Sequence, residues 1–182
     1  MARLYLVRHG KAAAGWDAEP DPGLDETGRA QAEAMAESLA SIGPLPLVAS
    51  PLRRTRETAR ALERRWHLQA RIEPDVAEIP SPIDDLAQRG AWLRDIMQRR
   101  WTELDPWLGA WRNRVVAALA AIETDTVIVS HFIAINAALG HALGDDRVIL
   151  FRPENCSCTV LDVGKDGFRL VERGAEGVTR VL

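Results

Sequence analysis

Leu4-Tyr5-Leu6-Val7-Arg8-His9-Gly10 is the stretch that decides the fold of this chain. Its four apolar residues predict a buried strand, and a guanidinium and an imidazole follow directly where that strand ends. Ligands of open α/β sheets bind beyond the carboxyl ends of the strands. Val127-Ile128-Val129-Ser130-His131 repeats the arrangement, an apolar strand that ends in a histidine. The two strand ends together predict one site for an anion.

Strand-like and helix-like segments alternate along the chain, which favours a three-layer α/β/α sandwich with a mostly parallel central sheet. Asp25 is suited to cap a first helix, and Met35, Leu39 and Ile42 form its apolar stripe until Gly43-Pro44 ends it. Apolar periodicity and capping residues predict the remaining elements: a strand at 45–49, a helix starting at Ser50-Pro51, a helix from Ser81-Pro82 towards Trp101, helices at 106–122 and 132–143, and a hairpin joining 156–163 to 168–173. Residues 11–23 are expected to form a loop over the edge of the sheet.

The composition fits one globular domain over residues 1–182. The chain is 182 residues long and 47% hydrophobic, which is enough to bury a core without disulfides or metals. Because no signal segment and no apolar run of membrane-spanning length is present, we expect a soluble cytoplasmic protein without a membrane partner. The net charge of −3 argues against nucleic acid as the main partner, since binding to phosphate backbones needs a broad basic surface.

Several residues with reactive or aromatic side chains are expected to serve packing or to lie at the surface. Cys156 and Cys158 alternate in the last predicted hairpin, too close in sequence for an easy disulfide and without the histidines of a zinc site. His67 and His141 match no motif and are expected at the surface or at a helix cap. The tryptophans 92, 101, 107 and 111 are expected in the core, with a substrate lid or a self-association surface as alternatives, whereas Trp16 could face the anion site.

The chemistry of Arg8-His9-Gly10 suits phosphate. A histidine attacks phosphorus only as a neutral imidazole with one free nitrogen, and a neighbouring guanidinium discourages its protonation. Arg8 would therefore lower the pKa of His9 and also clamp phosphoryl oxygens through two N–H groups. Gly10, which lacks a Cβ, would allow a sharp turn and close approach of the phosphate. A chance tripeptide at a strand end is the alternative for these residues alone.

A second basic group is expected from the helix that follows Ser50, whose N-terminal amides favour an anion. Arg53, Arg54 and Arg56 compete for this role. At roughly 100° per residue, Arg53 lies about 150° and Arg54 about 110° from the centre of the apolar stripe, which favours Arg54 without excluding Arg56. The remaining arginines of this helix, Arg60, Arg64 and Arg65, are expected on its solvated face.

Three segments resemble the motifs of the histidine phosphatase superfamily, which has the phosphoglycerate mutase-like fold. Leu6-Val7-Arg8-His9-Gly10 resembles its signature, Ser50-Pro51-Leu52-Arg53-Arg54-Thr55 through Thr58-Ala59 its second motif, and Val129-Ser130-His131 its third. Residues 24–32 are similar to the segment usually found between the first two. The resemblance spans most of the chain, with the motifs in the family's order.

The resemblance implies a role for each matching residue. His9 would be the nucleophile that becomes phosphohistidine, and Arg8, Arg54 and His131 would bind the phosphoryl group and stabilise its transition-state charge. The match thus selects Arg54 among the three competing arginines. The sequence shows no phosphate-binding P-loop and no carboxylate cluster suited to magnesium, so we expect a reaction without a metal or another cofactor.

The family also implies a carboxylic acid between the second and third motifs, and Glu78 in Val76-Ala77-Glu78-Ile79-Pro80 matches best. An alkoxide leaves poorly from a phosphate monoester unless a proton is delivered to it. Glu78 would therefore be protonated during attack, through a pKa raised by partial burial and by the nearby dianion. The same group would then deprotonate the water that hydrolyses phosphohistidine. A surface carboxylate in a loop is the alternative.

Three positions depart from the family's pattern. Phe132 follows the second histidine where glycine is usual, Lys11 follows the first motif where a carboxylate or threonine is commoner, and Asp25 stands where threonine is usual. None of these departures removes a catalytic group. They affect the expected substrate preference, although Lys11 could also be an exposed loop lysine.

Three functions agree with these observations. The first is a phosphatase that acts on a small phosphorylated substrate or a phosphoprotein through phosphohistidine. The second is a phosphoglycerate mutase-type phosphotransferase, for which the chain lacks the length of the usual substrate-enclosing segments. The third is a non-catalytic module that binds phosphorylated ligands. The identity of the substrate is left open by the sequence, and homo-oligomerisation is compatible with it.

Overall fold

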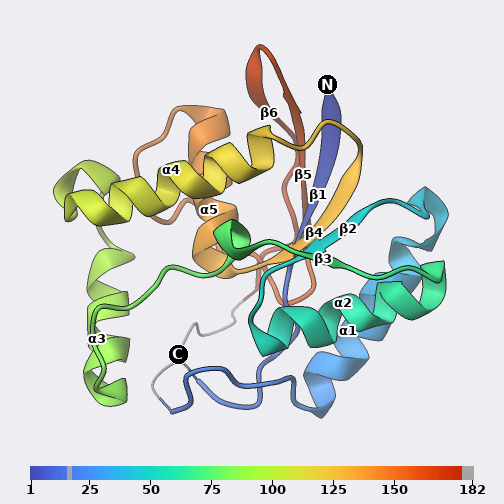
Figure 1. The fold of residues 1–182 in the computed structure, drawn as a ribbon. Coiled ribbons are helices and arrows are strands. Elements are labelled where there is room, and N and C mark those ends of the chain that lie inside the picture. The colour runs from blue at the N-terminus through green and yellow to red at the C-terminus, as the bar shows by residue number, and fades with distance from the viewer. Residues whose placement is uncertain (16–17, 178–182) are drawn as a thin grey trace.

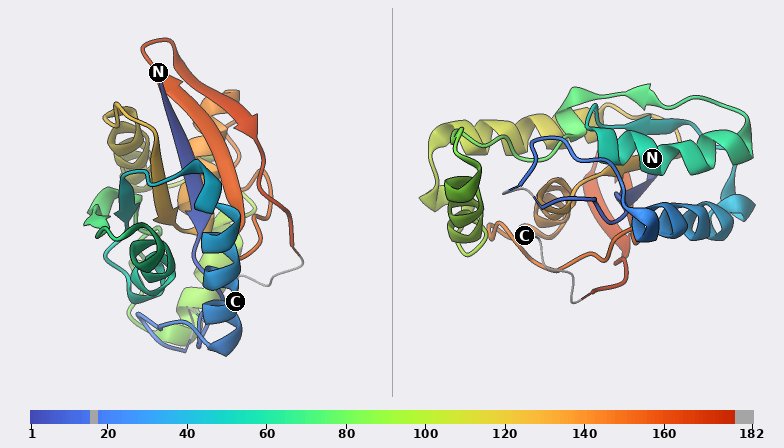
Figure 2. Two further views of the ribbon diagram at one scale, coloured as in Figure 1. Left: turned by 90° about the vertical axis from the view of Figure 1, so that its right-hand side faces the viewer. Right: turned by 90° about the horizontal axis from the view of Figure 1, so that it is seen from below.

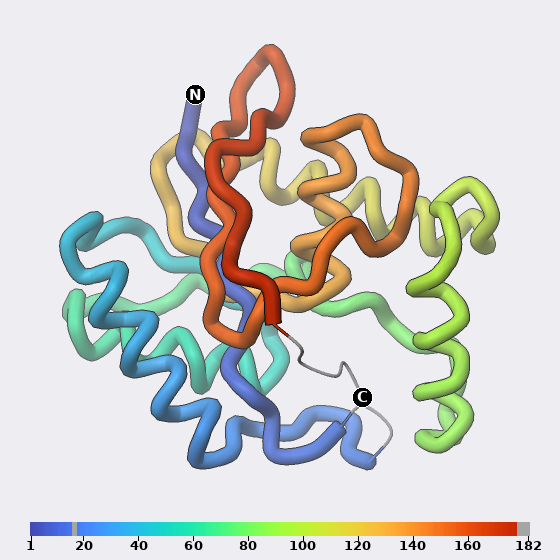
Figure 3. The backbone as a smooth tube through the Cα atoms, turned by 180° about the vertical axis from the view of Figure 1, so that it is seen from behind, coloured from blue at the N-terminus to red at the C-terminus, as the bar shows by residue number. Residues whose placement is uncertain are grey.

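The computed structural model describes residues 1–15 and 18–177, and its centre is one six-stranded sheet in the order β3-β2-β4-β1-β5-β6 (Figure 1). The strands are β1 (Ala2–Arg8), β2 (Leu47–Ala49), β3 (Arg71–Ile72), β4 (Thr126–Ser130), β5 (Cys158–Gly164) and β6 (Gly167–Glu172). The first four of the order are parallel, whereas β5 and β6 form an antiparallel hairpin beside β1 (Figure 3). The sheet is thus mixed, with the parallel part and the C-terminal hairpin that the sequence predicts.

The sheet separates two apolar cores, because successive side chains of a strand point to opposite faces. Leu4 and Leu6 of β1 belong to the core under α4 (Pro106–Ala120) and α5 (Phe132–Leu143). Val7 belongs to the core under α1 (Glu26–Ser38) and α2 (Arg53–Trp66). Figure 2 shows these helix pairs on the two faces of the sheet, which is the three-layer sandwich expected from the sequence.

β1 and β4 lie side by side in the middle of the sheet, and both are almost entirely buried. Their parallel register pairs Arg8 with Ser130, so the two strands end at the same level. The backbone N–H of His9 donates to the carbonyl of Ser130 at 3.0 Å. This register brings the residues that follow the two strands, His9 and His131, to one edge of the sheet.

α3 (Leu86–Ile96) lies beside α4 and away from the sheet (Figures 1 and 2). Leu93 and Ile96 attach it to the α4–α5 core, together with Trp101 of the short 3-10 helix η3 (Trp101–Glu103). The other short helices are η1 (Ala40–Ile42) and η2 (Pro74–Val76). Arg89 of α3 and His9, which follows β1, line the same cavity.

The observed ends of α1, α2 and α3 differ from the expected ones. Asp25 caps α1 as expected, accepting from Gly28 N at 2.7 Å, but α1 ends at Ser38 and the chain continues as η1. α2 begins at Arg53 with Leu52 as its N-cap, so the expected cap by Ser50 is wrong. α3 begins after Asp85, which accepts from Gln88 N at 3.0 Å, and ends at Ile96, so the expected start at Ser81 is also wrong.

The two cysteines do not share a strand. Cys156 precedes β5 and has a φ of 59°, so the expected alternation of Cys156 and Cys158 along one face is wrong. Both side chains are nevertheless partly buried against the α1–α2 core, which agrees with a packing role. Burial raises the pKa of each thiol to about 12, so both are protonated at neutral pH.

The tryptophans divide between core and surface. Trp101 and Trp111 are buried with their rings 5.9 Å apart, and Trp92 is half-buried. Trp107 is 39% exposed, so its expected place in the core is wrong. Trp16 lies outside the described residues.

The remaining histidines lie where the sequence places them. His67 ends α2 in the left-handed conformation and is exposed, and His141 is exposed in the last turn of α5. Among the described residues, no helix combines the length and apolar character that a membrane crossing requires.

Candidate active site

A cavity of about 490 Å³ opens beyond the carboxyl ends of β1 and β4. Its walls come from the loop after β1, the start of α2, the segment before α3, α3 itself and the start of α5, so it fills the space beside α3. Four of the predicted site residues line it: Arg8, His9, Arg54 and Glu78. His131 is completely buried and lies behind His9, with the two ring centroids 5.2 Å apart.

His9 is held as a neutral imidazole whose Nε2 is unprotonated. Its Nδ1 lies 2.7 Å from the carbonyl of Gly10, an acceptor only, so Nδ1 carries the proton. Its Nε2 therefore accepts, and Arg54 Nε donates to it at 3.2 Å. Burial, followed by Arg54 and Arg8, lowers the pKa of His9 well below its ordinary value. These contacts direct the unprotonated nitrogen of His9 towards a guanidinium donor.

Two arginines supply positive charge next to this nitrogen. Arg8 Nη1 donates to the carbonyl of Pro153 at 2.8 Å, and its guanidinium lies 5.1 Å from the centre of the Phe132 ring. Arg8 Nε has no hydrogen-bond partner in the described part of the chain. Burial lowers the pKa of Arg8 to about 10 and also lowers the pKa of Arg54, and Arg8 remains cationic at neutral pH.

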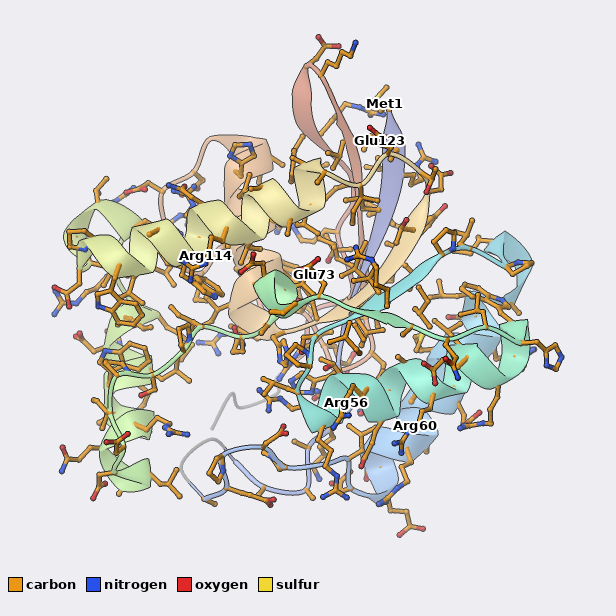
Figure 4. The ribbon with its side chains drawn as sticks, in the orientation of Figure 1. Met1, Arg56, Arg60, Glu73, Arg114 and Glu123 are labelled. Carbon is orange, nitrogen blue, oxygen red and sulfur yellow. The ribbon has the colours of Figure 1, made fainter. Side chains whose placement is uncertain are left out.

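The structure decides among the arginines of α2. The Arg54 side chain is only 11% exposed and points to His9, whereas Arg53 is exposed and pairs with Glu57 at 2.7 Å. Arg56 and Arg60 are exposed along the outer side of α2 (Figure 4). Arg64 and Arg65 are exposed and pair with Glu33 and Glu37 of α1.

His131 is oriented by a serine that the sequence assigned to a helix cap. Ser50 Oγ lies 2.6 Å from His131 Nε2 and 2.8 Å from Thr55 Oγ1. No group in residues 1–15 or 18–177 bonds to Nδ1 of His131, which is buried. Burial, together with the charges of Arg54 and Arg8, lowers the pKa of His131 well below its ordinary value. A second neutral imidazole thus stands behind the first.

Glu78 is half-buried beside the N-terminus of α5. Both its carboxyl oxygens lie 3.2 Å from Ile133 N, and Oε1 also accepts from Ile79 N at 3.0 Å. Burial raises the pKa of Glu78, while these two N–H groups and the two arginines oppose that rise. Glu78 thus lies in a loop, with its carboxyl in the wall of the cavity. A half-buried carboxyl whose proton is retained more readily is suited to general acid catalysis.

Gly10 is required by packing. A Cβ on Gly10 would lie 2.5 Å from the carbonyl oxygen of Gly28, so the missing side chain lets α1 approach the end of β1. The N–H of Gly10, next to the expected phosphate position, donates to Thr58 Oγ1 at 3.0 Å. The group that approaches Gly10 closely in this structure is the backbone of Gly28. Close approach of a phosphate to Gly10 stays a prediction.

The residues that depart from the family's pattern lie together. Lys11 Nζ pairs with Asp25 Oδ2 at 2.9 Å, so two of the three departures are partners of each other. Lys11 also lines the cavity, with its side chain 56% exposed. Phe132 is buried, lines the cavity and carries the Arg8 guanidinium over its ring.

The segment before β5 was not predicted as part of the site. Asn155 Nδ2 donates to the carbonyl of His9 at 2.8 Å, Cys156 N donates to the carbonyl of Arg8 at 2.9 Å, and Pro153 accepts from the Arg8 side chain. Asn155 also lines the cavity. The segment lies far from His9 in sequence and has no periodic pattern, so only its pairing with β1 reveals its role.

No three His, Cys, Asp or Glu side chains gather as a metal site within the described ranges.

At the strand ends of this α/β sheet, a neutral histidine lies beside two cationic guanidinium groups, an arrangement that is suited to bind an anion. The chain belongs to the histidine phosphatase superfamily, branch 1, whose family model matches residues 4–176. This match confirms the family and the enzyme class that the motifs predict.

The similar proteins include one named as a phosphatase and one named as a probable mutase. The structure of a mycobacterial glucosyl-3-phosphoglycerate phosphatase in complex with VO3 is 26% identical, covers 97% of this chain and 100% of that chain, and has a TM-score of 0.73. A Photorhabdus laumondii protein named "Probable phosphoglycerate mutase GpmB" is 28% identical over 187 residues, which are 89% of this chain and 85% of the relative. A crystal structure from Escherichia coli K-12, 20% identical, covers 99% of this chain and 100% of that chain with a TM-score of 0.76, and confirms the fold.

Proposed function

We propose that this protein hydrolyses a phosphomonoester, or a phosphohistidine, through a phosphohistidine intermediate on His9. The observation that carries the proposal is the pair of contacts on the His9 ring. Gly10 holds the proton on Nδ1, and Arg54 meets the free lone pair on Nε2. An anion bound by Arg54 and Arg8 would lie in front of that lone pair.

The first half-reaction transfers the phosphoryl group to His9. His9 Nε2 forms the bond to phosphorus while the bond from phosphorus to the leaving oxygen breaks. Glu78 gives its proton to that oxygen, which avoids the release of a free alkoxide. The carbonyl of Gly10 accepts from Nδ1 and so stabilises the positive charge that develops on the imidazole. Arg8, Arg54 and the free Nδ1 side of His131 stabilise the charge on the phosphoryl oxygens.

The second half-reaction releases phosphate. A water oxygen bonds to phosphorus, the bond between phosphorus and Nε2 breaks, and the water's proton returns to Glu78. The neutral form of His9, which burial and the two arginines favour, makes the histidine available for another turnover. A small phosphorylated molecule fits the cavity, and a phosphohistidine side chain of a protein would place the same group in it.

The test is phosphate release from p-nitrophenyl phosphate by the wild type, His9→Ala and the control variant His141→Ala, whose histidine is exposed. We expect wild-type activity from His141→Ala and none from His9→Ala. Quenching with alkaline SDS after mixing with a ³²P-labelled substrate should trap label that is stable to alkali and labile to acid on the wild type, and none on His9→Ala. Full activity of folded His9→Ala overturns the mechanism.

The relative named as a mutase gives the experiment a second arm. With 3-phosphoglycerate as substrate, the proposed phosphatase releases inorganic phosphate, whereas a mutase forms 2-phosphoglycerate. If neither product forms across a panel of phosphomonoesters but the protein binds phosphorylated ligands, it is a binding module and the phosphatase proposal is wrong.

A further inference from the structure

The candidate active-site cavity is larger than a phosphoryl group requires, and its outer part has its own chemistry. Beyond Arg8, His9, Arg54 and Glu78, the walls are mainly apolar, with Leu52, Ile79, Pro80 and Phe132 among them. Charged side chains enter this outer part at only three of the described lining residues: Lys11, Glu19 and Arg89. The leaving group of a bound phosphomonoester would lie among these residues.

In the described part of the cavity wall, one cation has no assigned anion. Arg8 and Arg54 match the charge of a phosphate dianion. Lys11 is paired with Asp25 at 2.9 Å. The charge of Glu19 acts on Arg53, which is exposed at the start of α2. Among the carboxylates of residues 1–15 and 18–177, none is therefore assigned to Arg89.

Arg89 is built into the wall rather than spread over the surface. It lies on the first turns of α3, is half-buried, and its Nε makes one long contact of 3.4 Å to the carbonyl of Ile83. No carboxylate in residues 1–15 or 18–177 forms a salt bridge with its guanidinium, whereas Arg99, just after the same helix, pairs with Asp95 at 2.9 Å. The terminal N–H groups of Arg89 thus have donor capacity for a ligand. A planar guanidinium is suited to bind a carboxylate or a phosphate through two parallel N–H groups.

We propose that Arg89 binds a second anionic group of the substrate, so that the preferred substrates are phosphomonoesters whose leaving group carries a carboxylate or a second phosphate. The apolar walls between Arg54 and Arg89 would contact the carbon skeleton that joins the two anionic groups. This inference rests on the proposed phosphatase function and concerns the same cavity. It adds a requirement on the leaving group that the phosphate clamp alone does not impose.

Matched pairs of substrates test the proposal. 3-Phosphoglycerate and glycerol phosphate differ by a carboxylate in place of a hydroxymethyl group, and phosphoserine and phosphoethanolamine differ by a carboxylate in place of hydrogen. Fructose 1,6-bisphosphate and fructose 6-phosphate test a second phosphate in the same way. For each pair, the ratio of kcat/KM for the doubly anionic member to kcat/KM for its partner is measured.

The variants are Arg89→Met, which keeps the length of the side chain, and Arg94→Met as the control. Arg94 lies on the same helix, is exposed and does not line the cavity. We expect the wild type and Arg94→Met to share a ratio above one for at least one pair. In Arg89→Met that ratio should fall by about tenfold or more, as for the loss of a charge-assisted hydrogen bond. Arg89→Lys should restore part of it.

The outcomes separate this inference from the proposed function. If the wild type hydrolyses the singly charged members and every ratio is unchanged in Arg89→Met, the Arg89 subsite is wrong and the phosphatase function stands. If the wild type hydrolyses no member of any pair and no aryl phosphate, the proposed function itself fails. Circular dichroism and thermal unfolding of Arg89→Met exclude loss of the fold as the cause of a changed ratio.

Discussion

Arg54 Nε lies 3.2 Å from His9 Nε2, so the unprotonated nitrogen of the histidine faces the guanidinium that would bind a phosphoryl group. The α2 helix supplies this arginine because Thr55 and Thr58, which follow it in sequence, are buried, so that Arg54 lies at the edge of the buried face of the helix. The charge of Arg54 helps to lower the pKa of His9, and the same guanidinium would place a bound anion next to Nε2.

Arg54→Met should lower kcat/KM for p-nitrophenyl phosphate by about 10²- to 10³-fold, as for the loss of other preorganised charge-stabilising donors. It should also raise the pKa of His9, because Arg54 is the largest charge that lowers it. Arg56→Met, on the exposed side of the same helix, is the control and should leave both quantities unchanged (Figure 4). Steady-state kinetics and ¹⁵N NMR of the histidine rings measure the two effects. Equal activities of the two variants would show that Arg54 does not hold the phosphoryl group.

Glu78→Gln should reveal a general acid through its dependence on the leaving group. We expect a loss of about 10²- to 10⁴-fold with alkyl phosphates, whose alkoxides need a proton. The loss should be much smaller with p-nitrophenyl phosphate, because its phenolate leaves without one. The amide oxygen of glutamine can still accept from Ile133 N, which preserves the contact with α5.

Glu26→Gln, an exposed change at the start of α1, is the control for Glu78→Gln. A loss that is the same for alkyl and aryl phosphates would contradict proton donation by Glu78. It would instead indicate that the variant disturbs the position of the site as a whole.

The sequence predicts the strand ends of the site well, because they depend on local pattern and on one rule of topology. Apolar runs followed by His9 and His131 are visible in the sequence, and parallel neighbours in a sheet end at the same edge. Glu78 was found only through resemblance to the family. Its burial comes from contacts with α5, more than 50 positions away, which no local pattern shows.

The wrong helix starts have a common physical cause. Local rules expect a serine hydroxyl to bond to the first backbone N–H groups of a helix, but in the folded chain the hydroxyl bonds to another group. Ser50 looks like a helix cap, but its hydroxyl bonds to His131, and the helix begins later without a side-chain cap. Ser81 likewise bonds to Ile83 N before α3 starts. Asn155 and Arg89 were not singled out because their roles depend on the packing of distant segments against β1 and beside the cavity.

The two buried histidines should make the protein sensitive to acid. The pKa of each is lowered in the folded state from an ordinary value of 6.5, chiefly by burial. Below that value the unfolded chain takes up protons that the folded protein excludes. The stability they contribute is therefore present above pH 6.5 and is lost as the pH falls towards the folded-state pKa values.

Urea denaturation at a series of pH values measures this effect. The free energy of unfolding should fall by about 1.4 kcal/mol per pH unit for each such histidine once the pH lies well below its unfolded pKa. His131→Asn should have a shallower slope than the wild type over this interval, whatever its stability at neutral pH. Parallel slopes would show that His131 is not held neutral by the fold.

Gly10→Ala tests the contact that brings α1 to the end of β1. The new Cβ would lie 2.5 Å from the carbonyl oxygen of Gly28, a backbone atom that cannot rotate away. We expect a loss of about 1 to 3 kcal/mol in the free energy of unfolding, as for other overpacked sites, together with reduced activity because His9 moves with its neighbour. Gly109→Ala is the matched control, since a Cβ there meets nothing within 4 Å on α4. That change should stabilise the protein by about 0.5 to 1 kcal/mol through helix propensity. Urea denaturation of both variants decides the matter, and a Gly10→Ala protein as stable as the wild type would mean that α1 can shift to admit the methyl group.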